Sequence, residues 1–299
     1  MDTLALSAPE VDPVAVRIES LHKRFGATEA LRGLDAQIRY GRLTGLVGPD
    51  GAGKTTLMRI LTGLLNPDSG RAAVAGFDTV ADNEAIHAVT GYMPQRFGLY
   101  EDLTVMENLR LYAQLRGIGA NGTDALFAEL LDFTRLVPFT KRLAGKLSGG
   151  MKQKLGLACA LMARPRVLLL DEPGVGVDPV SRQDLWRMVQ ALTDEGMAVV
   201  WSTAYLDEAE RCESVLLLNE GRLLFDGPPG ELTAQLKGRS FRLENAGTRR
   251  RTLLTEALDL PSVSDGVIQG AGVRLVLREG ADRTPVQTLA DTAGLELAQ

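Results

Sequence analysis

The hydrophobic and polar positions of the chain alternate in some segments and run together in others. Residues 16–20 and 35–39 alternate between apolar and polar side chains, the pattern of strands in a sheet with one exposed face. Three later segments, 43–48, 167–171 and 198–203, are almost continuously apolar. Such runs are typical of strands in a parallel sheet that is buried on both faces. The two patterns together predict an α/β protein built around a buried sheet.

Helical spacing of apolar residues dominates the middle of the chain, from residue 104 to 163. A hairpin is predicted over 214–227, and a short helix opened by proline follows at 228–238. From about residue 239, strand, helix, hairpin and helix patterns succeed one another without a cluster of catalytic residue types. We expect a small separate α+β domain at 239–299.

The composition is that of an ordinary soluble globular protein, with 45% hydrophobic and 24% charged residues among 299. The formal net charge of -5 gives no overall attraction to nucleic acid, and we interpret the basic run at 249–251 as a solvated surface. Residues 1–14 are small, acidic and proline-bearing, which predicts a disordered tail and not a signal peptide. No apolar run approaches the roughly 20 residues that span a bilayer, so we expect no direct membrane insertion.

The most specific motif, GPDGAGKTT at residues 48–56, follows an apolar strand and opens a predicted helix. It satisfies the G-x-x-x-x-G-K-[ST] pattern in the strand–helix context that this pattern requires. Its glycines permit a tight turn whose backbone N–H groups point at phosphate oxygens, and the helix beginning near Lys54 adds the positive end of its dipole. Lys54 is predicted to reach the β- and γ-phosphates of a nucleotide, and the Thr55 hydroxyl to coordinate Mg²⁺. The predicted nucleotide-binding residues of this loop are Gly48, Pro49, Asp50, Gly51, Ala52, Gly53, Lys54, Thr55 and Thr56.

Two other apolar strands end in polar residues. The segment VLLLDEP, residues 167–173, delivers Asp171 to the end of its strand. If this strand neighbours the one before the phosphate loop, Asp171 lies beside the loop and holds the Mg²⁺ shell. Glu172 follows and is predicted to accept a proton from an attacking water. The strand at 198–203 ends in Ser202 and Thr203, hydroxyl residues that we expect to be aimed at the ligand.

A third motif, LSGGM at residues 147–151, opens a helix with serine and two glycines, an arrangement that presents N–H groups to phosphate. With the other two motifs in this order and spacing, the chain resembles the ATP-binding cassette (ABC) family over about residues 15–235. The resemblance implies an α/β fold of the P-loop NTPase type, with a helical subdomain at about 95–163 and an antiparallel β subdomain. We therefore expect a nucleotide-binding domain at 15–238, followed by the small α+β domain.

Further roles follow from this resemblance. Phe25 stands where the family places an aromatic ring against adenine. Two cassettes of the family sandwich two ATP molecules head to tail, so Ser148, Gly149 and Gly150 would touch the nucleotide bound by the partner cassette. Asp178 matches the aspartate of the loop at the dimer interface. The implied cofactors are ATP and Mg²⁺. The implied catalytic residues are Lys54, Glu172 and Gln95, and the implied metal contacts are Thr55, Gln95 and Asp171.

One position departs from the family in a way that bears on catalysis. The segment AVVWSTAYLDEAE resembles the family's switch segment, in which a histidine just after the strand bonds the γ-phosphate, and that position here is Ala204. Neither His22 nor His87 is near a strand end that could substitute. Losing one group that stabilises a transition state typically costs ~2.7–4 kcal/mol, or roughly 10²–10³ in rate. We predict a site that binds ATP but turns over slowly, and we expect Tyr205, the next residue, to have a hydrophobic packing role.

Two further departures are milder. Asp50 replaces the asparagine usual in the phosphate loop, and its carboxylate adds like-charge repulsion toward ATP. Gly174 replaces the threonine usual after DEP.

The resemblance implies the ATP-hydrolysing subunit of a membrane exporter, similar to the first cassette of tandem-cassette bacterial exporters of the multidrug type. Its implied partners are transmembrane permease subunits, contacted near Gln95 and residues 98–110, and a second cassette, either a different one with its own histidine or another copy. The chain would sit at the cytoplasmic face of the inner membrane, and its two widely separated cysteines suit a reducing compartment. Two alternatives stay open: a regulatory cassette that hardly hydrolyses ATP, and a cassette ATPase acting on ribosomes or DNA, although basic tails and heptad arms are lacking.

Overall fold

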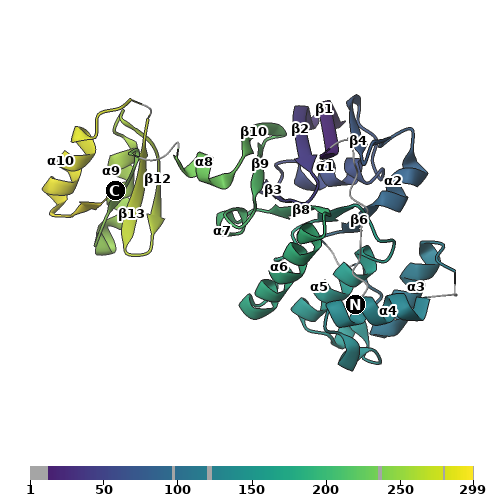
Figure 1. Cartoon of the computed structure of the whole chain (residues 1–299). Coiled ribbons are helices and arrows are strands. Elements are labelled where there is room, and N and C mark those ends of the chain that lie inside the picture. Colours follow the sequence, from purple (N-terminus) through teal and green to yellow (C-terminus); the bar gives the residue numbers. More distant parts are fainter. Residues whose placement is uncertain (1–12, 96–97, 120–122, 235–237, 279, 299) are drawn as a thin grey trace. The chain divides into compact units, whose positions relative to one another are not determined.

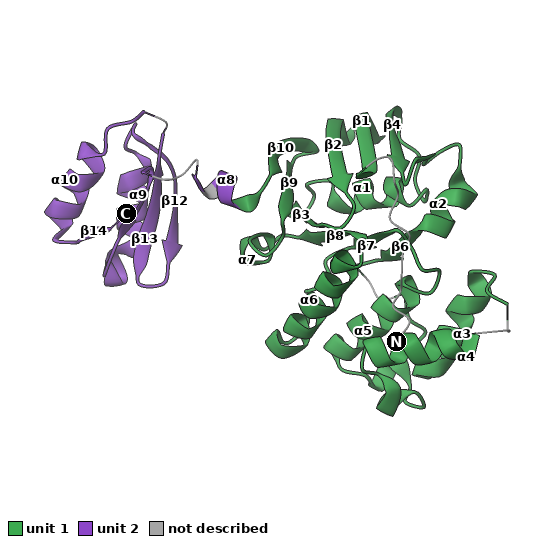
Figure 2. Ribbon diagram, in the orientation of Figure 1, with its two compact units in different colours: residues 1–229 green, residues 230–299 purple. Residues whose placement is uncertain are grey.

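The computed structural model describes residues 13–95, 98–119, 123–234, 238–278 and 280–298. The chain divides into two compact units, one reaching to Pro229 and the other beginning at Gly230 (Figure 2). Most of the tail predicted at 1–14 lies outside the described residues. The prediction is wrong at its last position, because Val14 already opens the first strand and the Pro13 carbonyl accepts a hydrogen bond from the Tyr40 backbone.

A six-stranded sheet forms the centre of the first unit, in the order β10-β9-β3-β8-β7-β6 (Figure 1). Its pairs are parallel except for the β9–β10 hairpin, which the sequence predicted. Every residue of β3, β7 and β8 is buried, as their continuous apolar runs predicted. The strands are β3 (Leu43–Val47), β6 (Thr90–Met93), β7 (Val167–Leu170), β8 (Ala198–Thr203), β9 (Ser214–Asn219) and β10 (Arg222–Gly227).

A second, antiparallel sheet covers one face of this layer, in the order β2-β1-β4-β5 (Figure 1). Along β1, Val16 and Ile18 are buried while Arg17 and Glu19 are more exposed, which confirms the alternating pattern. The inward residues form one core with helix α1 (Lys54–Leu61) and with the near side of the central sheet. The strands are β1 (Val14–Phe25), β2 (Thr28–Arg39), β4 (Ser69–Val74) and β5 (Phe77–Asp78).

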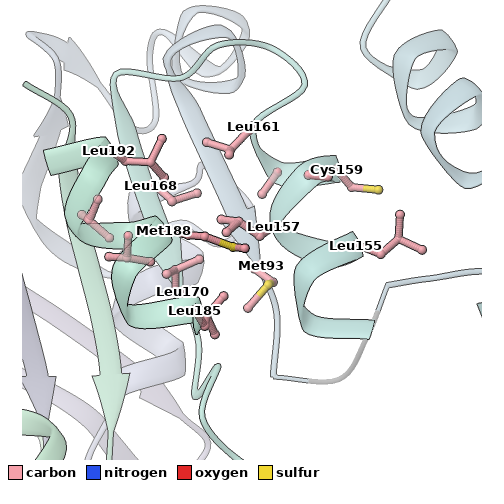
Figure 3. Packing of buried hydrophobic residues seen from close by; sticks show 14 of the residues in the cluster. Met93, Leu155, Leu157, Cys159, Leu161, Leu168, Leu170, Leu185, Met188 and Leu192 are labelled. Carbon is pink, nitrogen blue, oxygen red and sulfur yellow. The ribbon is translucent and has the colours of Figure 1, made fainter. Parts of the chain in front are cut away.

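Helices cover the other face of the central sheet. Figure 3 shows Leu168 and Leu170 of β7 meeting side chains of α5, such as Leu157, and of α6, such as Met188. In the same core Trp201 of β8 stacks on Trp186 of α6, with ring centroids 4.0 Å apart. The helices of this unit are α1, α2 (Asn83–Val89), α3 (Val105–Leu115), α4 (Thr123–Phe133), α5 (Gly149–Ala160), α6 (Pro179–Asp194) and α7 (Leu206–Ala209), with short 3-10 turns η1 (Val137–Phe139) and η2 (Ala144–Lys146).

The second unit is an α+β sandwich with its own core. Its sheet has the order β12-β13-β11-β14, all pairs antiparallel, and buried residues of α9 and α10 pack with the inward strand residues such as Phe241 and Leu275. The chain order β11-α9-β12-β13-α10-β14 is that of a ferredoxin-like split βαβ unit. The elements are β11 (Ser240–Leu243), η3 (Gly247–Arg249), α9 (Arg250–Leu258), β12 (Val263–Gln269), β13 (Gly272–Leu277), α10 (Thr284–Ala293) and β14 (Leu297–Ala298).

The boundary between the units falls after Pro229, the first residue of helix α8 (Pro229–Ala234), which is earlier than the change of residue pattern near 239. The residue pattern changes where the strands of the second unit begin, so it marks the sheet of that unit and not the short helix that precedes it.

Candidate nucleotide-binding site

The phosphate loop connects β3 to α1, as the sequence predicted. Gly51 and Gly53 have φ angles of 79° and 107°, in the left-handed region that favours glycine. Gly48 cannot be replaced by a residue with a side chain for another reason: a Cβ there would lie 2.2 Å from the carbonyl oxygen of Leu218. Gly53 is also the N-cap residue of α1. The backbone therefore turns directly into the positive end of a helix, the arrangement that binds phosphate groups.

Lys54, at the start of α1, has a side chain that is only 4% exposed. Its Nζ donates to the carbonyl oxygens of Gly48 at 2.7 Å and Pro49 at 3.1 Å. The same Nζ lies 3.2 Å from Oε1 of Glu172, whose side chain is 10% exposed. The ammonium group is therefore held at the mouth of the loop by two carbonyls and one carboxylate.

Glu172 joins the loop to Gln95. Its Oε2 accepts a hydrogen bond of 2.7 Å from the Gln95 Nε2. Its backbone has a φ of 52°, a left-handed conformation that a residue with a side chain rarely adopts. Such a conformation persists only where the surroundings enforce it, and it is frequent at functional sites. Two of the three residues predicted to be catalytic, Lys54 and Gln95, therefore both contact the third, Glu172.

Asp171 is not linked to the phosphate loop through neighbouring strands, which was the arrangement that the sequence suggested. The strands β3 and β7 are not neighbours, because β8 lies between them. The end of β8 makes the connection: the Ser202 hydroxyl donates to Oδ1 of Asp171 at 2.8 Å and accepts from the Glu172 backbone N–H at 2.9 Å. The Tyr92 hydroxyl donates to the other oxygen at 3.3 Å, and burial, together with the Asp171 charge, raises the pKa of Tyr92 to about 12.

The expectation that Ser202 and Thr203 face the ligand is wrong. Both are buried, and their hydroxyl groups bond protein atoms: Ser202 bonds the two acidic residues, and Thr203 Oγ1 accepts from the Tyr205 backbone N–H at 3.0 Å. The role of Ser202 was missed because the sequence does not reveal that β8 separates β3 from β7. Its signal was present, since a polar residue that ends a wholly apolar strand needs a partner.

A cavity of about 520 Å³ lies at this place. Seven of the nine predicted phosphate-loop residues line it, from Asp50 to Thr56, together with Gln95 and Glu172. Gly48 and Pro49 are not lining residues; they contribute the carbonyl groups that hold Lys54. The remaining lining residues are Thr28, Ala30, Val175, Ala204 and Tyr205.

Phe25, the predicted adenine contact, is not among the lining residues. It pairs with Thr28, which does line the cavity, across the β1–β2 turn, and its side chain is half exposed. The Lys23 ammonium lies 5.6 Å from the centre of its ring. Phe25 therefore lies on the opposite side of the β1–β2 turn from Thr28, a residue of the cavity wall.

The switch position contributes no polar side chain to the cavity. Ala204 lines it and is exposed, and neither His22 nor His87 is a lining residue. The expectation that Tyr205 packs in apolar surroundings is wrong, because its side chain is half exposed and lines the same cavity. Tyr205 lies two residues after Thr203, the last residue of β8, where the chain has already left the core.

The start of the LSGGM motif, which we call the signature turn, does not line this cavity; its residues are Ser148, Gly149 and Gly150. Ser148 is the N-cap of α5, and its Oγ accepts from the Met151 backbone N–H at 3.3 Å. A Cβ at Gly150 would lie 2.3 Å from the Cβ of Ser181 in α6, so the glycines allow the signature turn to pack directly on the start of that helix.

Asp178, the predicted interface residue, is the N-cap of α6. Its Oδ1 accepts from the Ser181 backbone N–H at 3.0 Å. Hydrogen bonds from the Ser181 hydroxyl and backbone hold the pKa of Asp178 below 3.8. The side chain is exposed and ionised next to the signature turn.

Comparison with known proteins agrees with this geometry. Residues 31–175 match the family model described as ABC transporter. A protein of Escherichia coli (strain K12) named "Probable multidrug ABC transporter ATP-binding protein" is 60% identical over 273 residues, 91% of this chain, but the match spans only 47% of that protein. The chain therefore spans about half the length of the curated relatives to which it is 60% identical. A daunorubicin resistance ATP-binding protein of Streptomyces coeruleorubidus is 38% identical over 225 residues, which are 75% of this chain and 71% of that protein.

Solved structures show the same fold. The ATP-binding subunit of an ABC transporter superposes with a TM-score of 0.67 at 28% identity, over 75% of this chain and 93% of that one. A dimeric ATP-binding cassette in a post-hydrolysis state, bound to ADP and Pi, gives a TM-score of 0.65 at 25% identity, over 72% of this chain and 98% of that one. Among the residues that the structure describes, no helix is long and apolar enough to cross a bilayer.

Proposed function

Because the chain belongs to the ATP-binding subunits of ABC transporters, we propose that it is the ATPase of a membrane exporter and that its own ATP site turns over slowly. The observation that best supports this proposal is the cavity that the phosphate loop, Gln95 and Glu172 line together, in which the residue at the switch position is Ala204. The relatives named for multidrug transport, daunorubicin resistance and Nod factor export support the exporter assignment.

In the proposed reaction, the triphosphate of ATP enters the phosphate loop and takes the place of Glu172 as the partner of the Lys54 ammonium. Glu172, released from Lys54 but still bonded to Gln95, accepts the proton of the attacking water. Mg²⁺ fits the oxygen donors present, with the Thr55 hydroxyl and Gln95 at the cavity and the Asp171 carboxylate behind them, and would neutralise developing phosphate charge. Phe25 is one turn from the cavity wall and would cover the adenine once the base is in place.

Two partners complete the proposal. A second cassette would pair head to tail, with Ser148, Gly149 and Gly150 touching its nucleotide and Asp178 at the shared interface. A different cassette with its own switch histidine would then perform most of the hydrolysis at the site that this chain completes.

Permease subunits would contact the face near Gln95 and residues 98–110 and hold the chain at the cytoplasmic side of the inner membrane. A groove of about 830 Å³ is lined by residues of α2, β6 and the last turn of α3, and two of its lining residues, Leu64 and Leu115, are 61% and 67% exposed. Exposed apolar side chains in a groove suit a short helix of a membrane partner.

Titration of the chain with Mg²⁺-ATP by calorimetry tests the nucleotide site. We expect binding by the wild type and at least ~100-fold weaker binding by Lys54→Ala, because the only side-chain cation of the loop is lost. Lys141→Ala, at an exposed position away from the cavity, is the control and keeps wild-type affinity. Equal affinity of the Lys54 variant and the wild type contradicts the assignment of the site.

Purification of the tagged chain from detergent-solubilised membranes tests the exporter assignment. We expect an integral membrane protein to accompany the wild type and to be lost with Leu115→Arg, which places a charge in the groove. Co-purification with ribosomes instead contradicts the exporter assignment.

The second candidate function, a regulatory cassette that binds ATP and hardly hydrolyses it, is also favoured by the alanine at position 204. It predicts that turnover stays at the level of the Glu172→Gln variant even after a histidine is introduced at position 204.

A further inference from the structure

Glu208 is a buried acidic residue of helix α7, just beyond the switch position, and only 2% of it is exposed. Its Oε2 accepts a hydrogen bond of 2.9 Å from the indole N–H of Trp201. Its Oε1 lies 3.7 Å from Nη1 of Arg182 in α6 and has no hydrogen-bond partner among the described residues. A carboxylate is expensive to bury, so its place in the core calls for an explanation.

The Glu208 carboxylate lies directly against Gly174. A Cβ added to Gly174 would come within 2.3 Å of Oε1 and 3.1 Å of Cδ. The carboxylate is the end of a flexible side chain, but it is buried and bonded to Trp201, so it cannot move aside without breaking that bond. Gly174 is also a position at which the family pattern has threonine. Glycine here is therefore matched to the carboxylate that occupies the space of the missing side chain.

Both neighbours of Glu208 lead to Glu172. Gly174 follows Glu172 by two residues on the same loop. Trp201 directly precedes Ser202, whose hydroxyl accepts the backbone N–H of Glu172 and bonds Asp171. Glu172 has the left-handed φ of 52° that the surroundings must enforce. The Glu208 carboxylate therefore contacts both segments that hold the backbone of Glu172: the loop, at Gly174, and strand β8, at Trp201.

We propose that Glu208 is a positioning residue for Glu172, and that Gly174 is the glycine that makes room for its carboxylate. The inference rests on the proposed role of Glu172 as the acceptor of the water proton. Removing Glu208 leaves the Trp201 N–H and the Arg182 guanidinium with a cavity in place of their partner, and the loop after Glu172 loses its support. A shift of about 1 Å in a catalytic group can lower a rate by roughly 100-fold while substrate binding persists.

A double-mutant cycle in thermal unfolding tests the contact without any need for turnover. The four proteins are the wild type, Gly174→Thr, Glu208→Ala and the double variant. We expect Gly174→Thr to lower Tm by several degrees in the wild-type background and by less than half as much when residue 208 is alanine, because the space is then free. Gly119→Thr, where a Cβ meets nothing within 4 Å, is the steric control. Equal shifts of Tm in both backgrounds overturn the matched pair of Gly174 and Glu208.

Turnover tests the positioning role. In the Ala204→His background, which we expect to be the active one, Glu208→Ala should lower kcat by about 10- to 100-fold while the Kd for ATP changes less than about threefold. Glu208→Gln, which retains an oxygen for the Trp201 N–H, restores part of the rate, and Glu210→Ala on the exposed side of the same segment leaves it unchanged. An unchanged kcat in Glu208→Ala overturns the positioning role. If Glu172→Gln in the Ala204→His background turns over as fast as Ala204→His alone, the proposed role of Glu172 fails instead, and the thermal cycle still tests the Gly174–Glu208 contact separately.

Discussion

The phosphate loop and the switch segment line one cavity but are built in different ways. The loop, residues 48–56, takes its shape from its own glycines: Gly51 and Gly53 turn the chain, and Gly48 packs against the Leu218 carbonyl. The end of the switch segment, residues 204–209, is instead held by side chains of β8 and α6, with Glu208 bonded to Trp201 and close to Arg182. The glycines that the first region needs can therefore be recognised in its own sequence, whereas the contacts that hold the second region appear only in the tertiary structure.

This difference has a consequence for function. A loop defined by its own sequence keeps its ability to bind phosphate when a distant residue changes. A segment held by tertiary contacts can keep its position while the residue that performs chemistry is replaced. In the function that we propose, Ala204 takes the place of a switch histidine while the Glu208–Trp201 contact remains, so we expect ATP binding to be separable from hydrolysis in this chain.

The largest expected effect separates the two functions of the cavity. Glu172→Gln removes the proton acceptor and should lower Mg²⁺-ATP turnover by roughly 10²–10⁴-fold relative to any active parent, the usual contribution of a general base. ATP binding should persist or tighten, because Lys54 no longer pairs with a carboxylate. Radiolabelled ATP hydrolysis and calorimetric titration check the two halves. Loss of ATP binding in this variant contradicts the separation of binding from catalysis.

A smaller effect is expected from the loop itself. Gly48→Ala places a methyl group 2.2 Å from the Leu218 carbonyl oxygen, and a backbone atom cannot swing aside as a side chain can. We expect a loss of about 1–3 kcal/mol in the free energy of unfolding, measured by urea denaturation, together with weaker ATP binding. Gly119→Ala, at an open position, provides the matched control. Unaltered stability of Gly48→Ala argues against packing as the reason for this glycine.

The smallest effect concerns the attachment of α6, which carries both Arg182 and Asp178. Asp184 of this helix receives a hydrogen bond of 2.9 Å from Lys154 of α5, and this bond, with the nearby Arg135 and Arg187 charges, holds the pKa of Asp184 below 3.8. Because the pKa is lower in the folded state, the stabilisation is complete above pH 3.8 and is lost as the pH falls through the folded-state pKa.

The Asp184→Asn variant should therefore be less stable than the wild type at pH 7, by up to about 1 kcal/mol. The difference should vanish in strongly acidic solution. Urea denaturation at a series of pH values measures it, and a difference that is the same at every pH assigns the effect to packing and not to charge.

The regions that the sequence predicted well are those with local signals. The glycines of the phosphate loop, the wholly apolar β3, β7 and β8 and the hairpin of β9 and β10 all carry their pattern within a few residues. The order of the strands does not, since nothing in a strand's own residues says that β8 lies between β3 and β7. Ser202 was therefore expected at the ligand and is instead the bridge between Asp171 and Glu172.

Other misses have the same cause. Tyr205 carries an apolar ring and was expected to pack, but its exposure depends on where the chain leaves the core after β8. The burial of Glu208 is invisible in an acidic segment such as LDEAE, where a charged helix face is the ordinary interpretation. The match between Gly174 and Glu208 joins residues 34 positions apart, as a tertiary contact that neither segment indicates alone.

The most direct test of the central claim is the Mg²⁺-ATP turnover of the purified chain alone, wild type beside Ala204→His, with Glu172→Gln as the blank. The missing γ-phosphate contact predicts that the wild type is near the blank and that the histidine raises the rate by roughly 10²–10³-fold. Brisk turnover by the wild type with no gain from the histidine would contradict the account and indicate a self-sufficient homodimer.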